Sequence, residues 1–75
     1  MGDFPQVLPK DVVKILERCG FVITRQTGSH MRLAHTNGRK VTVAIHNRPL
    51  AIGTLLAILR QAQMSKEEFK ELLQA

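Results

Sequence analysis

The sequence has no tryptophan and no tyrosine, and its aromatic residues are three phenylalanines. With 44% hydrophobic but only 4% aromatic residues, a chain of 75 residues can form one small aliphatic core. There is one cysteine, Cys19, which excludes an internal disulfide and fits a reducing compartment. We therefore expect a single domain that comprises residues 1–75 and is stabilised by aliphatic packing.

Long hydrophobic runs are absent as well. No apolar run approaches the ~20 residues that a membrane-spanning helix requires. The N-terminal residues have neither the apolar core of a signal peptide nor the serine or threonine at position 6 that myristoylation requires. These absences predict a cytoplasmic protein that does not bind a membrane.

Acidic residues are missing from the whole middle of the chain. Between Glu17 and Glu67 there is no aspartate or glutamate. The same interval holds a series of cations, namely Arg18, Arg25, Arg32, Arg39, Lys40, Arg48, Arg60 and Lys66. Such a one-sided field, in a chain of net charge +5, suits a polyanion such as nucleic acid. The alternative is a basic surface that contacts only solvent, which many small proteins have.

The spacing of apolar residues predicts a helix, three strands and two further helices. Pro9 suits the first turn of the first helix, and Gly20 suits its end. Ser65 and Glu68 have the spacing of a capping box, which predicts the start of the last helix. The expected elements are a helix at 10–19, strands at 21–26, 29–34 and 41–45, a helix at 53–62, and a short helix after residue 65. This order predicts an α+β fold whose helices cover one sheet face and leave the other face open.

The turn between the second and third strands determines which side chains share that open face. A three-residue loop at 37–39 pairs Leu33 with Val43 and places His46 directly opposite His30. The alternative register, shifted by two residues, leaves His46 diagonal to His30, at ~7–8 Å between the backbones. Both registers keep the two histidines on one face of the sheet.

The turn at Gly28 is the second determinant of the open face. The same parity argument places either Gln26 or Thr24 beside His30 on the neighbouring strand. A β-bulge would alter this pairing. The open face is then expected to carry these side chains: His30, Arg32, His46, Thr24 and Thr42.

This face has the minimum equipment for cutting RNA without a metal ion. The ribose 2′-hydroxyl attacks the neighbouring phosphate once a base removes its proton, an acid protonates the leaving 5′-oxygen, and cations stabilise the transition state. His30, with Arg32 beside it and His46 across the sheet, meets these needs. From chemistry alone, an exposed turn histidine without such a role is a slightly better explanation of His30. For His46, a cap of the strand end is a stronger alternative.

The remaining reactive side chains do not indicate another class of site. Three histidines without nearby acids or thiols are a poor ligand set, so we expect no metal ion and no cofactor. His35 has the wrong parity for the open face and is interpreted as a loop residue. Cys19 lies on the apolar stripe of the first helix, which predicts packing rather than nucleophilic chemistry.

Residues 28–31, Gly-Ser-His-Met, also match the remnant that tag removal leaves at a terminus. This copy is internal and lies between two predicted strands, so it belongs to the protein. It is one of an ordered set of motifs: Gly20-Phe21, Gly28-Ser29-His30, Asn37-Gly38, a strand at 41–46, and Gly53-Thr54-Leu55. The set, from Lys10 to about Leu73, closely resembles the HicA-type toxins of toxin–antitoxin systems, also called YcfA-like proteins.

The resemblance implies a double-stranded-RNA-binding-domain-like fold and the activity of an mRNA interferase. It also implies that the histidine of the Gly-Ser-His motif, here His30, is catalytic, and that a cognate HicB-type antitoxin covers the site. Two positions depart from the family pattern: Ala44 stands where proline is frequent, and Gln63 stands where glycine is frequent. The first departure weakens what the resemblance implies for His46.

The leading hypothesis is a metal-independent endoribonuclease that cleaves mRNA, with His30 as general acid or base and Arg32 stabilising the transition state. The residues expected to contact RNA are Arg25, Ser29, Arg32, Arg39, Lys40 and Arg48. The alternative is a non-catalytic RNA-binding module, against which the shortage of aromatic rings for base stacking speaks. A third possibility is an interaction subunit whose basic face binds an acidic protein.

Overall fold

The computed structural model describes residues 6–74 and has the predicted order of elements. The chain forms α1 (Pro9–Arg18), β1 (Val22–Thr27), β2 (His30–Ala34), β3 (Lys40–Ala44), α2 (Ile52–Ala62) and α3 (Lys66–Gln74). Pro9 occupies the first turn of α1, as expected from its fixed φ. The capping box is confirmed as well, because Ser65 Oγ accepts the Glu68 N–H and Glu68 Oε1 accepts the Ser65 N–H.

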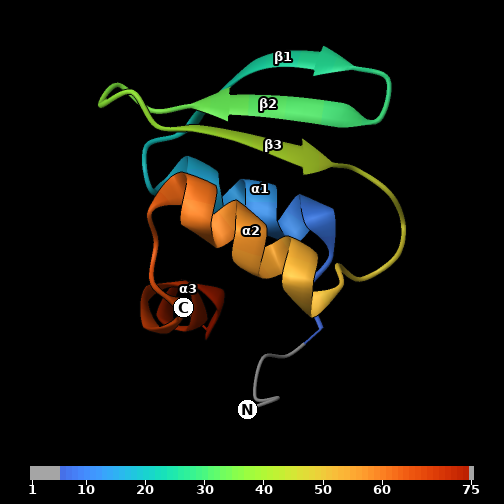
Figure 1. Ribbon diagram of the computed structural model, residues 1–75, viewed down its shortest axis with the longest axis vertical. Helices are drawn as coiled ribbons and strands as arrows, with labels where there is room; N and C mark the ends of the chain where they lie inside the picture. Colours follow the sequence, from blue (N-terminus) through green and yellow to red (C-terminus); the bar gives the residue numbers. More distant parts are fainter. Residues whose placement is uncertain (1–5, 75) are drawn as a thin grey trace.

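The three strands form one antiparallel sheet in the order β1-β2-β3. Figure 1 shows α1 and α2 on one side of this sheet, with no helix on the other side. The α3 helix contacts both of these helices and does not touch the sheet's open side. The α+β class and its open face are therefore confirmed, and the arrangement is consistent with a double-stranded-RNA-binding-domain-like fold.

The core lies between the sheet and the helices and is mostly aliphatic. Alternation along β2 and β3 turns one set of side chains to the helices, and helical spacing turns a stripe of α1 and α2 to the sheet. The best-buried members are Phe69, Leu16, Leu33, Leu55, Val12, Val41 and Val43. Phe21 and Phe69 are both buried, whereas Phe4 lies outside the described residues. No helix in the described part of the chain is long and apolar enough to cross a membrane.

The β2–β3 register differs from the first of the two predicted registers. Leu33 pairs with Val41, and His30 pairs with Ala44, which is the second predicted register, in which His46 is diagonal to His30 and not opposite it. The hairpin closes by a hydrogen bond from His35 N to Arg39 O, which makes residues 36–38 the loop. Gly38 has φ +97°, and a three-residue hairpin loop requires such a left-handed residue at its last position. The glycine therefore places the loop one residue earlier than 37–39.

The β1–β2 turn also differs from the prediction. Thr27, and not Gln26 or Thr24, pairs with His30, because Gly28 and Ser29 form a two-residue loop. Gln26 faces Met31 on the side of the helices. Further along β1 the ladder has an irregularity between Ile23 and Arg25, where it skips one residue. On either side of it, Ile23 pairs with Leu33 and Arg25 pairs with Arg32. The possible bulge named above is thus present, and it lies beside the candidate site.

Candidate active site on the open sheet face

The open face of the sheet carries His30 and Arg32 on β2, two positions apart and both exposed. A hollow of ≈ 380 Å³ lies beside His30 and is lined by Arg25, Thr27, His30, Arg32 and Thr42. All three strands thus contribute to it. No acidic side chain is among these residues, so the potential inside the hollow is positive.

The irregularity in β1 positions a cation beside this hollow. Ile23 pairs with Leu33 on the helix side, whereas Arg25 already pairs with Arg32 on the open side. Thr24, the extra residue, also lies by Arg32, and its hydroxyl donates to the Arg32 carbonyl at 3.3 Å. If the ladder continued without the irregularity, Thr24 would pair with Arg32 and Arg25 would turn toward the helices, because the side-chain period of a strand is two.

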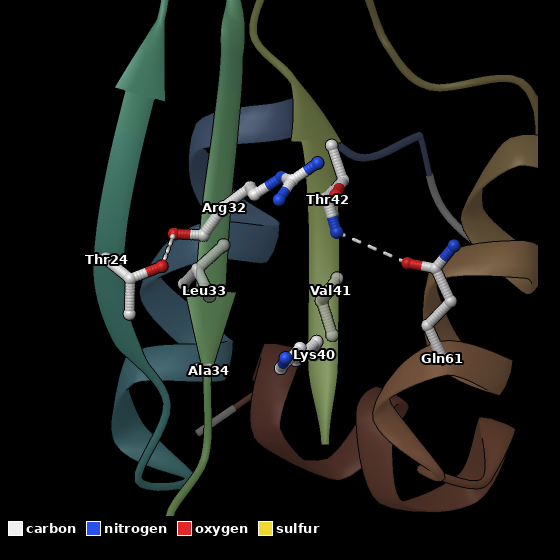
Figure 2. Close-up of a pocket in the computed structure, with 8 residues that line it drawn as sticks. All are labelled: Thr24, Arg32, Leu33, Ala34, Lys40, Val41, Thr42 and Gln61. Carbon is white, nitrogen blue, oxygen red and sulfur yellow. Dashed lines mark hydrogen bonds between the residues drawn. The ribbon is translucent and has the colours of Figure 1, made fainter. Parts of the chain in front are cut away.

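A second hollow of ≈ 650 Å³ adjoins the first and shares Arg32 and Thr42 with it. Figure 2 shows the Arg32 side chain reaching from β2 toward Thr42, and Lys40 near the start of β3. On the far side of β3, Gln61 of α2 accepts the Thr42 N–H on its Oε1 at 3.2 Å. The two hollows together form a basic groove across the sheet, with His30 in one part and Lys40 in the other.

His46 lies beyond the end of β3, in the connection to α2. Its Nδ1 accepts the Arg48 N–H at 3.3 Å, which holds the ring against its own loop. The loop begins close to the Gly28-Ser29-His30 turn, since Ile45 N donates to Ser29 O at 2.6 Å. His46 therefore comes directly after Ile45, which is bound to the turn before His30. His46 is diagonal to His30 and not opposite it.

The sequence of this chain matches one family model, that of the HicA toxin of bacterial toxin–antitoxin systems, over residues 9–64. The chain belongs to the HicA toxin family. Toxins of this family are known in general to cleave mRNA, and membership of a toxin–antitoxin system implies an antitoxin partner. No curated protein matches the sequence.

Arg39, which was expected to contact RNA, does not reach the open face of this HicA chain. It lies on the other side of β3 from Lys40, because the loop ends at residue 38. Its guanidinium donates to the Ala62 carbonyl at the end of α2 and to Asn37 Oδ1, and lies 5.0 Å from the centre of the Phe21 ring. The structure thus gives Arg39 a supporting role that the sequence did not indicate.

His35 is held in the same supporting cluster and is separated from the groove. Its Nε2 lies 3.1 Å from Cys19 O, and its Nδ1 accepts the Asn37 N–H at 3.2 Å. A carbonyl accepts only from a protonated nitrogen, so the ring is the neutral Nε2–H tautomer. Gly20 leaves room for this ring, because a Cβ at Gly20 would come within 2.9 Å of His35 Nε2. The prediction of a non-catalytic loop histidine agrees with this placement.

Cys19 of this HicA chain is not suited to nucleophilic chemistry. Cys19 is half-buried against the core, and burial, assisted by the Glu68 carboxylate, raises the pKa of its thiol. A raised pKa makes a nucleophilic role unfavourable. Among the described residues, no group of three His, Cys, Asp or Glu side chains could hold a metal ion. Gln61 was missed in the sequence, because only the packing of α2 along β3 brings it to the groove.

Proposed function

We propose that this HicA toxin is a metal-independent endoribonuclease that cleaves mRNA, with His30 as its main general acid or base. The observation that supports this most strongly is the position of His30, exposed in a hollow that three strands line with cations and hydroxyls. An imidazole is the side chain best suited to accept and donate protons near neutral pH. Family membership supplies the substrate class.

In the proposed reaction, the 2′-hydroxyl of one ribose attacks the phosphorus of its own 3′-phosphate. A base takes the 2′-hydroxyl proton, the bond to the 5′-oxygen of the next nucleotide breaks, and an acid gives that oxygen a proton. The products are a 2′,3′-cyclic phosphate and a 5′-hydroxyl. Arg32 and Arg25 are paired across β2 and β1, next to His30 in the hollow, and stabilise the charge of the pentavalent transition state.

The second proton transfer has one nearby candidate among the described residues, His46. The bond from Ile45 N to Ser29 O keeps its loop beside the Gly28-Ser29-His30 turn. Among the other residues predicted to contact RNA, Lys40 and Arg48 are exposed and suited to binding phosphates, while Ser29 shapes the turn through its carbonyl. A HicB-type antitoxin would inhibit the toxin by covering the same cationic face, for which an acidic surface is complementary.

The test compares wild type with His30→Ala on single-stranded RNA in the presence of EDTA. We expect His30→Ala to lower the cleavage rate by about 10²-fold or more, the usual contribution of a general acid or base. The wild-type products should carry a 2′,3′-cyclic phosphate, and a single 2′-deoxy substitution at the cleaved position should block the reaction. Undiminished cleavage by His30→Ala, with an unchanged circular dichroism spectrum, would refute the assignment. Binding of RNA without cleavage by wild type would favour the non-catalytic module.

A further inference from the structure

The larger hollow beside the His30 site is lined by polar side chains from four different elements. Arg32 and Lys40 supply two cationic groups, Thr42 supplies a hydroxyl, and Gln61 supplies an amide. Thr24 lines the β1 side. No aspartate or glutamate is among the residues that line it, so nothing in the described part of the chain neutralises its two cations from within.

Gln61 is held in a fixed orientation by the edge of the sheet. The Thr42 N–H points outward from β3 and can be satisfied only by an acceptor, so the side-chain oxygen of Gln61 must face it. This places the amide NH₂ on the remaining side, where it makes no hydrogen bond to another described residue. Figure 2 shows the nitrogen on the side of the amide away from β3, so a ligand that reaches over the β3 edge would meet two N–H donors whose orientation is already set, which lowers the entropic cost of binding.

The spacing of these donors continues from the proposed catalytic centre. Side chains two apart on a strand are separated by about 6.6 Å, so Arg32 lies one such step from His30 along β2. Lys40 is one step beyond Thr42, the partner of Arg32, in the same direction. An extended chain of phosphates that passes His30 would therefore meet Arg32 next and then Lys40.

We propose that the hollow bounded by Arg32, Lys40 and Gln61 is a binding subsite for a second phosphate of the RNA, adjacent to the phosphate that is cleaved at His30. A phosphodiester group offers several acceptor oxygens and a negative charge, which matches a site composed of donors and cations. The inference rests on the proposed function for its ligand class, RNA. It adds a residue, Gln61, and a second contact point outside the catalytic hollow.

The experiment measures binding rather than cleavage, in the His30→Ala background, which keeps the RNA intact. Lys40→Gln and Gln61→Glu are the test variants, and Gln63→Glu is the matched control, since it makes the same charge change on an exposed residue outside the hollow. Gln61→Glu retains the acceptor for Thr42 N–H, removes the two N–H donors and adds a negative charge, and the Gln63→Glu control carries the same added charge. We expect each test variant to raise the Kd for a short single-stranded RNA roughly tenfold, as for loss of one charge-assisted hydrogen bond, and the control to raise it less than about threefold.

A set of RNAs with one neutral methylphosphonate at successive positions then identifies the phosphate concerned. At one position, the methylphosphonate should weaken binding by the His30→Ala protein and abolish the further effect of Lys40→Gln or Gln61→Glu, because both changes remove the same contact. Additive effects at every position, or test variants no weaker than the control, would overturn the subsite. Absence of RNA binding would overturn it as well.

Failure of the subsite is distinguishable from failure of the proposed function. Wild-type protein that binds RNA with this coupling but never cleaves it would refute the nuclease and leave the subsite standing. Conversely, cleavage that depends on His30 but shows no coupling at Lys40 or Gln61 would refute the subsite alone. Should Gln61→Glu fail to fold, Lys40→Gln on the exposed start of β3 still decides the outcome.

Discussion

Replacing Gln63 by glycine should stabilise this toxin, for a reason visible in one pair of dihedral angles. Gln63 follows α2 with φ 54° and ψ 44°, and it is the one non-glycine residue of the described chain with a positive φ. The left-handed region costs a residue with a Cβ about 1–2 kcal/mol. Glycine avoids this cost but loses more backbone freedom on folding, by roughly 0.5–1 kcal/mol. The difference predicts a net gain of about 0.5–1 kcal/mol.

No packing or hydrogen bond is lost in this substitution. The Gln63 side chain is exposed, and the two bonds that close the helix end, Gln63 N to Arg60 O and Met64 N to Leu59 O, are made by the backbone. For a domain of this length, 1 kcal/mol corresponds to about 4–8 °C in Tm. Gln63→Gly should therefore raise the Tm by roughly 2–8 °C, measured by thermal circular dichroism and confirmed in urea.

The matched control is Gln63→Ala, which removes the same side-chain atoms but keeps the Cβ. Since the strain comes from the Cβ and not from the amide, Gln63→Ala should change the free energy of unfolding by less than about 0.5 kcal/mol. An equal gain in both variants would show that the side chain, and not the dihedral angle, was responsible. A Tm for Gln63→Gly at or below that of wild type would refute the reasoning altogether.

Two further predictions concern residues that the structure assigns to different roles. Arg39→Met should lower stability by about 1–2 kcal/mol, because it removes the cation over Phe21 and the donor to Ala62 O, whereas Arg25→Met should leave the Tm unchanged and weaken RNA binding several-fold. The reverse pattern in the two assays would contradict both assignments. Cys19 should react with iodoacetamide at pH 8 more slowly in the folded protein than in urea, because its raised pKa lowers the thiolate fraction. Equal rates in the two states would contradict this.

The elements and the exposed position of His30 on the open face were predictable because each depends on a local signal. Pro9, Gly20 and the Ser65–Glu68 pair mark helix ends by chemistry that acts within one turn. Alternation in β2 then places His30 on the face opposite Leu33. The ordered motifs predicted the family, which the match over residues 9–64 confirms.

The strand pairing was not predictable to the same degree. The β2–β3 register was predicted only as one of two alternatives, and the left-handed conformation of Gly38, which belongs at the last position of a three-residue loop, selects the loop 36–38 over 37–39. The extra residue at Thr24 has no signature in the sequence, since a β-bulge is a property of two paired strands. Because the β2–β3 loop ends at residue 38, Arg39 lies on the helix side of the sheet and not on the open face. Gln61 lies beside the groove only because α2 packs along β3.

The open face carries no phenylalanine among the described residues, and this limits how the toxin could recognise RNA. Within residues 6–74 both phenylalanine rings are buried, so a base in the groove could stack only on an imidazole or a guanidinium group. On the proposed function, RNA binding would then depend mainly on the release of counterions from the sugar–phosphate chain. Affinity should fall steeply as ionic strength rises and should vary little with base composition. Selection among mRNAs would then depend on which of them have unpaired, accessible segments, and not on their base sequence.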